Sequence, residues 1–416
     1  MTEASTDTNL TAALRQALAD VFAVETVVMD SEQAGLVHLY GRFLGDSAEA
    51  YAVVRDRFHT LGYVPLFREE DGRQVIRAVP GQLPVSKPNL RLAGILFGAT
   101  VLSTLFAGTF WHWQLDLSVA ENVFNGFLFA LPLLAILVAH EMGHYLVSQR
   151  LGIPVTLPYF IPLPISILGT MGAVIQMKAP PRNRRHLLAL GLAGPVAGLV
   201  LAIPLLVLGL HLSPIEPLDG VCQQFWADFP PDSEGSYGLE GNSILYGAIK
   251  TAQFGRFLPD CAPGQAKTFP DILHAALYGC PPCEGEDILL SPIASAAWAG
   301  FLVTGLNLIP VGTLDGGHVM YALVGRRSRY LTWIVIVALV ALGVWGISLG
   351  ILETLMWFLW ATLILFLGRR PAVPLDDVTR LEGWQIAVGL LILVIFVLTF
   401  SPIPMQAIPI PQAPTP

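Results

Sequence analysis

An apolar stretch of membrane-spanning length runs directly into a histidine and glutamate motif. Residues 124–139 are almost entirely apolar, and the sequence HEMGH follows at once. On a helix, His140 and His144 share one face, so both imidazoles can bind one zinc ion. Glu141 can take a proton from a water that the metal has made acidic. Because such polar groups are costly at the end of a membrane helix, we interpret the motif as a metal site rather than a chance match.

The composition is typical of an integral membrane protein. Of the 416 residues, 54% are apolar and only 13% are charged. The net charge of -8 argues against a nucleic-acid partner, and the lipid bilayer is the expected surrounding. We therefore predict an α-helical polytopic membrane protein. It would have about seven transmembrane helices, at residues 92–113, 122–147, 187–210, 293–309, 331–349, 351–367 and 384–400.

Residues 1–88 predict a small soluble α+β domain on the cytosolic side. The pattern indicates a helix over residues 10–22 and a strand over 36–44. A second helix, capped by Asp46, is expected through Leu61, followed by a hairpin with strands at 64–67 and 74–79. We find no catalytic cluster among these residues. His38 and His59 are interpreted as ordinary residues, and the domain as a regulatory or docking unit.

The segment after the histidine motif is unlike a helix, because prolines interrupt it repeatedly. Residues 168–176 look extended. Irregular backbone at membrane depth needs protein or a water-filled cavity around it, so we predict a membrane-embedded β-hairpin or re-entrant loop beside the site. A proline-rich surface loop is the alternative. Gly169, Thr170 and Gly172 are candidate substrate-binding residues, because an extended segment can pair with an unwound substrate by strand addition.

Basic clusters lie at residues 178–185, 325–329 and 369–370. Placing the amino terminus in the cytoplasm puts all three on the inside, as the positive-inside rule requires. The first thirty residues show no secretory signal, and no transit peptide is evident, so we expect a multi-pass protein of a bacterial plasma membrane. The acidic stretch 211–290 would then lie outside the cell.

The domain boundaries follow from these shifts in composition. We divide the chain into a soluble domain, a first membrane part, an acidic loop, a second membrane part and a proline-rich tail expected to be disordered, at residues 1–88, 89–210, 211–290, 291–401 and 402–416. The acidic loop holds all four cysteines, Cys222, Cys261, Cys280 and Cys283. An outside location favours two disulfides, with three pairings open. The CPPC sequence also suits a redox pair or zinc, but no thioredoxin-like pattern surrounds it.

Two histidines leave a catalytic zinc one protein ligand short, and Asp315 is the candidate for that position. It stands between Leu314 and two glycines on the same membrane side as the histidines. Capping of the following helix is the alternative role for Asp315. His318 is a candidate fourth ligand or substrate contact. Asn307 could donate to a developing oxyanion or to a bound substrate strand, or could serve as a helix-packing amide.

Four segments in this order resemble the site-2 protease family of intramembrane zinc metalloproteases: HEMGH, GTMGAV, AGPVAG and NLIPVGTLDGG. The resemblance covers residues 122–325. It implies His140, His144 and Asp315 as zinc ligands and Glu141 as the catalytic acid and base. It also implies cleavage of membrane-anchored regulators near the cytoplasmic face. No stretch resembles the PDZ domain of many bacterial members. The soluble amino-terminal domain and the NLIPVGTLDGG segment are instead similar to cyanobacterial and chloroplast members.

The function expected from these observations is peptide hydrolysis within or near transmembrane segments, in regulated intramembrane proteolysis. The partner would be a membrane-spanning substrate, such as an anti-sigma factor or another membrane-tethered regulator. Two alternatives stay open, a membrane zinc or metal transporter and a catalytically silent scaffold of the same fold. A transporter has no use for Glu141 as a general base. The sequence does not indicate an oligomeric state.

Overall fold

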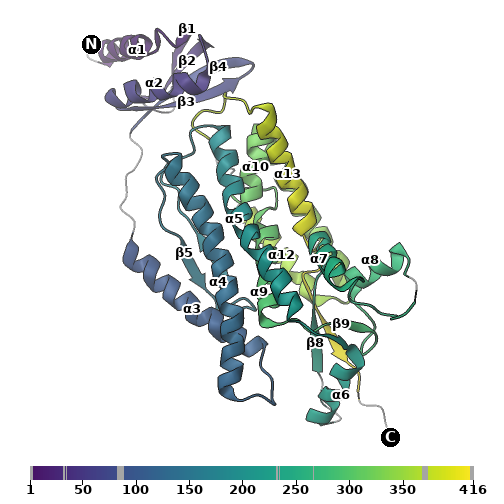
Figure 1. Ribbon diagram of the computed structural model, residues 1–416. Coiled ribbons are helices and arrows are strands. Elements are labelled where there is room, and N and C mark those ends of the chain that lie inside the picture. The colour runs from purple at the N-terminus through teal and green to yellow at the C-terminus, as the bar shows by residue number, and fades with distance from the viewer. Residues whose placement is uncertain are drawn as a thin grey trace.

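The chain forms a helix bundle with a small folded unit at each end (Figure 1). The computed structural model describes residues 3–30, 33, 35–81, 89–230, 233, 235–265, 267–367 and 373–412. Three predicted features fall outside the described residues: the linker at 82–88, the arginines at 369–370 and the tail end at 413–416.

The N-terminal unit is a four-stranded antiparallel sheet with two helices. Its sheet has the order β1-β2-β4-β3. Leu14, Leu18, Phe58 and Ile76 are fully buried and form its core with the strands. The elements are α1 (Glu3–Leu18), β1 (Phe22–Met29), β2 (Val37–Phe43), α2 (Ser47–Thr60), β3 (Tyr63–Glu70) and β4 (Arg73–Pro80).

The order of elements in this unit differs from the predicted one. The helix expected over residues 10–22 ends at Leu18, and Phe22 begins a strand that the prediction lacks. Leu14, Leu18 and Phe22 are four residues apart, so one helical face accounts for all three in the sequence. The structure buries all three in one core, but Phe22 enters it from β1. Asp46 caps α2 as predicted, accepting from the backbone amides of Ala48 and Glu49.

The bundle contains four helices that are long and apolar enough to cross a membrane, among the described residues. They span Leu90–Trp111, Val119–Arg150, Arg184–His211 and Asp315–Ser348. Each of the seven predicted spans coincides with a helix, but α9, α12 and α13 have only 16, 12 and 17 residues. The helices are α3 (Leu90–Trp111), α4 (Val119–Arg150), α5 (Arg184–His211), α9 (Pro292–Asn307), α10 (Asp315–Val324), α11 (Ser328–Ser348), α12 (Met356–Leu367) and α13 (Gly383–Thr399), with short 3-10 turns at Gly325–Arg327 and Leu352–Leu355.

A two-stranded hairpin follows α4. Strands β5 (Tyr159–Pro162) and β6 (Thr170–Val174) pair antiparallel. The hairpin lies between α3 and α4 and contacts both. Gly169 makes this contact close: a Cβ there would lie 2.5 Å from the Cα of Thr104 in α3. The Ser103 hydroxyl donates to the Gly169 carbonyl oxygen over 2.6 Å, which fixes the hairpin to α3.

The second folded unit, which we call the cap, lies at the end of the bundle opposite the N-terminal unit (Figure 1). Two disulfides, Cys222–Cys283 and Cys261–Cys280, join its short elements. Its parts are β7 (Ile215–Pro217), α6 (Leu218–Asp228), β8 (Gly235–Glu240), α7 (Ile244–Phe254), α8 (Phe269–Tyr278), β9 (Glu286–Ile288) and β10 (Met405–Ile410).

Strand β10 comes from the tail that was predicted to be disordered. Met405–Ile410 pairs antiparallel with β8 over its whole length. The proline-rich composition favoured disorder, but β8 and β10 form an isolated two-stranded ribbon. Proline is tolerated in such edge strands because its missing N–H can face away from the partner. The prediction was therefore wrong for these residues, which close the cap.

A short segment between α12 and α13 joins the N-terminal unit to the bundle. Leu375 belongs to the hydrophobic core of the N-terminal unit, and its carbonyl oxygen accepts from the amide of Phe67 in β3. The neighbouring Asp377 is buried and faces the bundle. It accepts from Arg184 of α5 over 2.9 Å and from the Tyr321 hydroxyl of α10 over 3.1 Å. The N-terminal unit is thus anchored to two helices of the bundle.

Candidate active site

Helix α4 carries the histidines and the glutamate of the HEMGH motif. It begins at Val119, where Ser118 and Glu121 form a capping box, and continues for 32 residues. His140 and His144 are one turn apart, with ring centroids 5.0 Å apart. The Nδ1 atom of His144 lies 3.0 Å from the backbone oxygen of Leu190 in α5. This contact turns the other ring nitrogen, Nε2, to within 3.3 Å of His140 Nε2.

Asp315 reaches both histidines from the first turn of α10. One carboxylate oxygen lies 3.2 Å from His140 Nε2, and the other lies 3.2 Å from His144 Nε2. The three donor atoms all lie within 4.8 Å of one another. The residue at the N-cap position of α10 is Leu314, and Asp315 follows it inside the helix. The carboxylate therefore serves the histidine pair, and the capping alternative is not what the structure shows.

The AGPVAG segment of α5 contains a glycine where a larger residue would displace His144. A Cβ added at Gly194 would lie 2.1 Å from His144 Nε2, far inside van der Waals contact. Gly143 of α4 has a similar constraint, because a Cβ there would lie 2.4 Å from the carbonyl oxygen of Ala193. Helices α4 and α5 therefore approach closely at the site, as small residues permit.

The two glycines after Asp315 allow the preceding loop to fold over the start of α10. A Cβ at Gly316 would lie 2.0 Å from the carbonyl oxygen of Leu308, and one at Gly317 would lie 2.4 Å from that of Val311. Without side chains at these positions, the loop after α9 turns back tightly. It brings Asn307 of α9 and Asp315 of α10 to the same histidine pair.

These residues line one cavity of about 350 Å³, together with Glu141, Thr313 and His318. Glu141 and His140 are buried, at 8% and 3% exposure. Asn307 Nδ2 lies 3.4 Å from His140 Nε2. Neither ring nitrogen of the buried His318 has a hydrogen-bond partner within the described part of the chain. The cavity therefore holds a three-donor cluster, a carboxylate beside it, and two further polar side chains without a full set of partners.

The hairpin supplies one wall of the cavity through Ala173, Val174 and Ile175. Thr170 is used within the hairpin, since its hydroxyl donates to the Ile161 carbonyl oxygen over 2.9 Å and accepts from the Gly172 amide over 3.0 Å. Gly172 is open, because a Cβ there would meet no atom of the described residues within 4 Å. Gly169 and Thr170 thus hold the hairpin in shape, and direct contact of all three residues with a substrate stays a prediction.

The donor set fits a zinc ion. Two imidazole nitrogens and one carboxylate are ligand types that zinc binds, and three protein ligands leave the fourth position open, as in catalytic sites. The contact between His144 Nδ1 and the Leu190 carbonyl oxygen is the outer contact that fixes the orientation of a ligating histidine. The sequence could not indicate Leu190, because a backbone carbonyl leaves no signature in a side-chain pattern.

A polytopic membrane protein with a buried His-His-Asp centre and an adjacent glutamate is the class that the fold and the site define. The chain belongs to Peptidase family M50, whose family model matches residues 128–344. This range contains all four sequence segments on which the resemblance was based, so the resemblance to the site-2 protease family is confirmed.

Sequence comparison finds similar proteins from plants. "Probable zinc metalloprotease EGY2, chloroplastic" of Arabidopsis thaliana is 30% identical over 400 residues, which cover 92% of this chain and 64% of the relative. The protein of the same name from Oryza sativa subsp. japonica is 30% identical over 402 residues, covering 92% and 65%. The chain thus spans just under two thirds of the length of these relatives. No solved structure matches the chain.

These comparisons correct the predicted location. The sequence led us to expect a bacterial plasma membrane, because no targeting segment was evident. The relatives are named as chloroplastic and come from plants, so they point to a chloroplast membrane instead. The prediction of a bacterial plasma membrane was therefore wrong. The soluble amino-terminal domain and the NLIPVGTLDGG segment, which are similar to cyanobacterial and chloroplast members, were the sequence features that pointed in this direction.

Proposed function

We propose that the chain is an intramembrane zinc metalloprotease that hydrolyses peptide bonds within or near transmembrane segments. The observation that carries the proposal is the convergence of His140, His144 and Asp315 in one cavity with Glu141, between apolar helices. Polar groups at membrane depth are retained for function. The names of the relatives, which describe zinc metalloproteases, support the same activity.

In this proposal, His140, His144 and Asp315 hold the zinc ion. Bound zinc supplies Lewis acidity for the attacking water and the scissile carbonyl. Glu141 takes the proton from that water and passes it to the leaving amine, as a general base and then a general acid. Asn307 donates a hydrogen bond to the oxygen on which negative charge develops. His318, whose ring nitrogens have no partner among the described residues, is placed in the same cavity to contact the substrate.

The substrate in this proposal is a single membrane-spanning segment that unwinds next to the zinc site. A helix hides its peptide bonds, so the segment must become extended before hydrolysis. Strand β6 pairs only with β5 among the described strands, and Met171 and Val174 on it are exposed. The free edge of β6 offers backbone groups for strand addition. Membrane-anchored regulatory proteins, including anti-sigma factors, are the proposed substrate class.

We extend the proposal to the arrangement in the membrane. The seven helices would all cross or enter the bilayer, with the hairpin embedded between α3 and α4. The N-terminal unit and the basic loops would lie on one side, and the cap on the other. In the same proposal, the soluble domain ends at residue 88, the first membrane part at 210, the acidic loop at 290 and the second membrane part at 401. The names of the relatives support a chloroplast membrane as the site of action.

The test combines zinc content and cleavage in detergent. The parent protein, Glu141→Gln and Asp315→Ala are assayed for bound zinc and for cutting of a single-span substrate with helix-breaking residues. We expect about one zinc per chain and cleavage for the parent. Glu141→Gln should keep zinc and lose cleavage, whereas Asp315→Ala should lose zinc. Cleavage by Glu141→Gln would rule out the proposed mechanism, and a metal-transport activity that survives this change would favour a transporter.

A further inference from the structure

A second and larger cavity lies at the cap end of the bundle. It has a volume of about 740 Å³ and lies between the cap-side ends of α3, α4, α5 and α9, the turn of the hairpin, and strands β8 and β10. We call it the cap cavity. Its volume is in the range of pockets that enclose a ligand of several functional groups. None of the residues proposed for zinc binding or hydrolysis lines it.

The cap cavity is aromatic and carries no free charge. Trp111, Trp113, Phe129 and Trp298 are among its lining residues. The single carboxylate in the lining, that of Glu240, accepts from the Tyr246 hydroxyl over 2.8 Å and pairs with Lys250 over 3.2 Å. The other titratable side chain of the lining is that of His112, whose Nδ1 atom lies 3.0 Å from the backbone oxygen of Gly108 and is thus already used within α3. An uncharged ligand is therefore favoured.

The lining also offers polar side chains that are not used within the protein. Asn125 of α4 and Ser295 of α9 line the cap cavity. Neither side chain makes a hydrogen bond with another residue in the described ranges. A lipid tail has no groups to bond with them, whereas a peptide backbone has both donors and acceptors. Aromatic walls with spare hydrogen-bonding groups therefore favour an extended peptide over a lipid tail.

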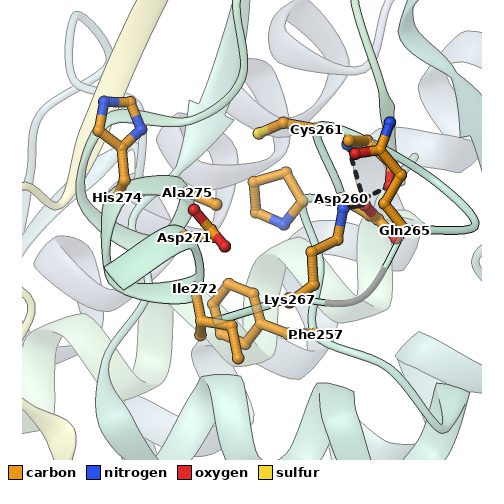
Figure 2. Close-up of a pocket in the computed structure, with 11 residues that line it drawn as sticks. Phe257, Asp260, Cys261, Gln265, Lys267, Asp271, Ile272, His274 and Ala275 are labelled. Atoms are coloured by element: carbon orange, nitrogen blue, oxygen red, sulfur yellow. Dashed lines mark hydrogen bonds and ion pairs between the residues drawn. The ribbon is translucent and has the colours of Figure 1, made fainter. Parts of the chain in front are cut away.

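A smaller pocket inside the cap differs from the cap cavity in how its polar side chains are used. Figure 2 shows this pocket, of about 250 Å³, with Lys267 extended towards Asp260. The two groups are 2.6 Å apart, so the charges neutralise each other within the cap. Asp271 is bonded to Thr268 at the start of α8. These three charged side chains are thus used within the cap, unlike Asn125 and Ser295 of the cap cavity.

Two elements connect the cap cavity with the zinc site. The hairpin lines the cap cavity with Leu168 at its turn and lines the zinc cavity with Ala173. Helix α4 does the same with Phe129 and His140. At 1.5 Å per residue, the helical rise from Phe129 to His140 is about 16 Å, and an extended chain covers it with about five residues. A substrate strand on the free edge of β6 would therefore continue into the cap cavity.

We propose that the cap cavity is a second substrate subsite, which binds an uncharged, extended segment of the substrate about five to seven residues from the scissile bond on the cap side. This inference rests on the proposed protease function and adds a preference for substrates that are uncharged at this distance from the scissile bond. Binding at a distance from the reacting bond can be used to hold the unwound segment in place, so it should affect turnover as well as binding.

The first experiment varies the substrate and leaves the protein unchanged. A single-span substrate with a mapped cleavage site receives a lysine or an aspartate at each position on the cap side. A charge five to seven residues from the scissile bond should lower kcat/KM about tenfold, and a charge about twelve residues away should not. Equal cleavage of all these substrates would overturn the subsite. Failure of the parent to cut any substrate would instead count against the protease function itself.

The second experiment varies the protein. Ser295→Trp places an indole ring in the lining of the cap cavity, and Ser348→Trp places the same side chain at the exposed end of α11, outside the cavity. Both variants should keep zinc. Ser295→Trp should lower kcat/KM about tenfold for the uncharged substrate and should leave a substrate truncated on the cap side unaffected. Equal rates for Ser295→Trp and Ser348→Trp would overturn the proposal.

A photocrosslinking side chain at position 295, in the Glu141→Gln background, tests occupancy without relying on cleavage. It should label the substrate five to seven residues from the mapped scissile bond, whereas the same group at position 348 should not. Labelling of lipid alone at position 295 would assign the cap cavity to lipid and overturn the proposal. This measurement does not depend on the Ser295→Trp variant, so it tests the proposal even if that variant fails to fold.

Discussion

The zinc site and the cap are held together by different means. At the zinc site, donors from α4 and α10 meet because glycines leave room for their neighbours: the His144 ring lies against Gly194, and the Leu308 carbonyl oxygen lies against Gly316. In the cap, short elements are joined by two disulfides and by ion pairs such as that between Lys250 and Glu240. The site depends on close packing of long helices, and the cap depends on covalent and charged links. Single small substitutions should therefore damage the site most.

The largest effect is expected from Gly194→Ala. The new methyl group would overlap His144 Nε2, at 2.1 Å, so the imidazole must move away from His140 and Asp315. We expect bound zinc and cleavage to fall about 100-fold, because orientation of a ligating histidine is worth that much. Zinc analysis and a cleavage assay on the purified protein measure this.

Gly98→Ala is the matched control for this change. Gly98 also lies in a membrane helix, α3, but a Cβ there meets no atom of the described residues within 4 Å. Zinc content and activity should be unchanged. If Gly194→Ala behaved like Gly98→Ala, close packing at Gly194 would not set the position of His144. The site would then not depend on close helix packing in the way proposed.

The next largest effect concerns the disulfides of the cap. The bond Cys222–Cys283 closes a separation of 61 residues, whereas Cys261–Cys280 closes 19. Loop-closure entropy gives about 4 kcal/mol for the first and about 3 kcal/mol for the second. Replacing Cys222 and Cys283 by serine should therefore expose the cap to proteolysis more than replacing the other pair.

Zinc content measures whether this damage stays in the cap. Both double variants should keep their zinc, because no cysteine lines the zinc cavity. Loss of zinc on removal of either disulfide would show that the cap and the site fold as one unit and are not stabilised separately.

The sequence predicted which side chains converge at the candidate zinc site better than it predicted the units around them. His140, Glu141 and His144 lie on one helix, so their spacing alone places them together. The prediction of Asp315 as a ligand rested on the two glycines that follow it. In the structure, these glycines make room for the loop that folds over the start of α10. Pairing of the cysteines could not be predicted, because it depends on how short elements with weak local signals fold together. Strands β1 and β10 were missed because local patterns favoured a helix and a disordered tail.

The segment at Asp377 was also missed, although it joins the N-terminal unit to the helix of Asp315. Asp377→Asn should loosen this joint, since Arg184 and Arg326 lose their common carboxylate. We expect a loss of about 1–3 kcal/mol, because breaking a partly buried ion pair leaves an unpaired charge. Hydrogen exchange at Phe67 in β3, which bonds to the same segment, should become faster.

Asp20→Asn is the control for Asp377→Asn. The Asp20 carboxylate pairs with Arg57 on the exposed surface of the N-terminal unit. Loss of an exposed pair has little effect on stability, so exchange at Phe67 should stay as in the parent. Faster exchange in both variants would show that the N-terminal unit is loosened as a whole, and that Asp377 has no particular role in the joint.

The smallest effect is a pH dependence confined to the cap. Burial, and next the nearby Glu240 carboxylate, raise the pKa of Asp287 in β9 to about 7, although Lys250 partly offsets this. The folded cap then holds a proton that the unfolded chain releases near its ordinary pKa. The resulting stabilisation is present at low pH and is lost as the pH rises through about 7. Proteolysis of the cap should be slower at pH 5 than at pH 8, and Asp287→Asn should remove most of this difference. A parent cap with equal resistance at both pH values would show that Asp287 is ionised throughout, with Lys250 as its effective partner.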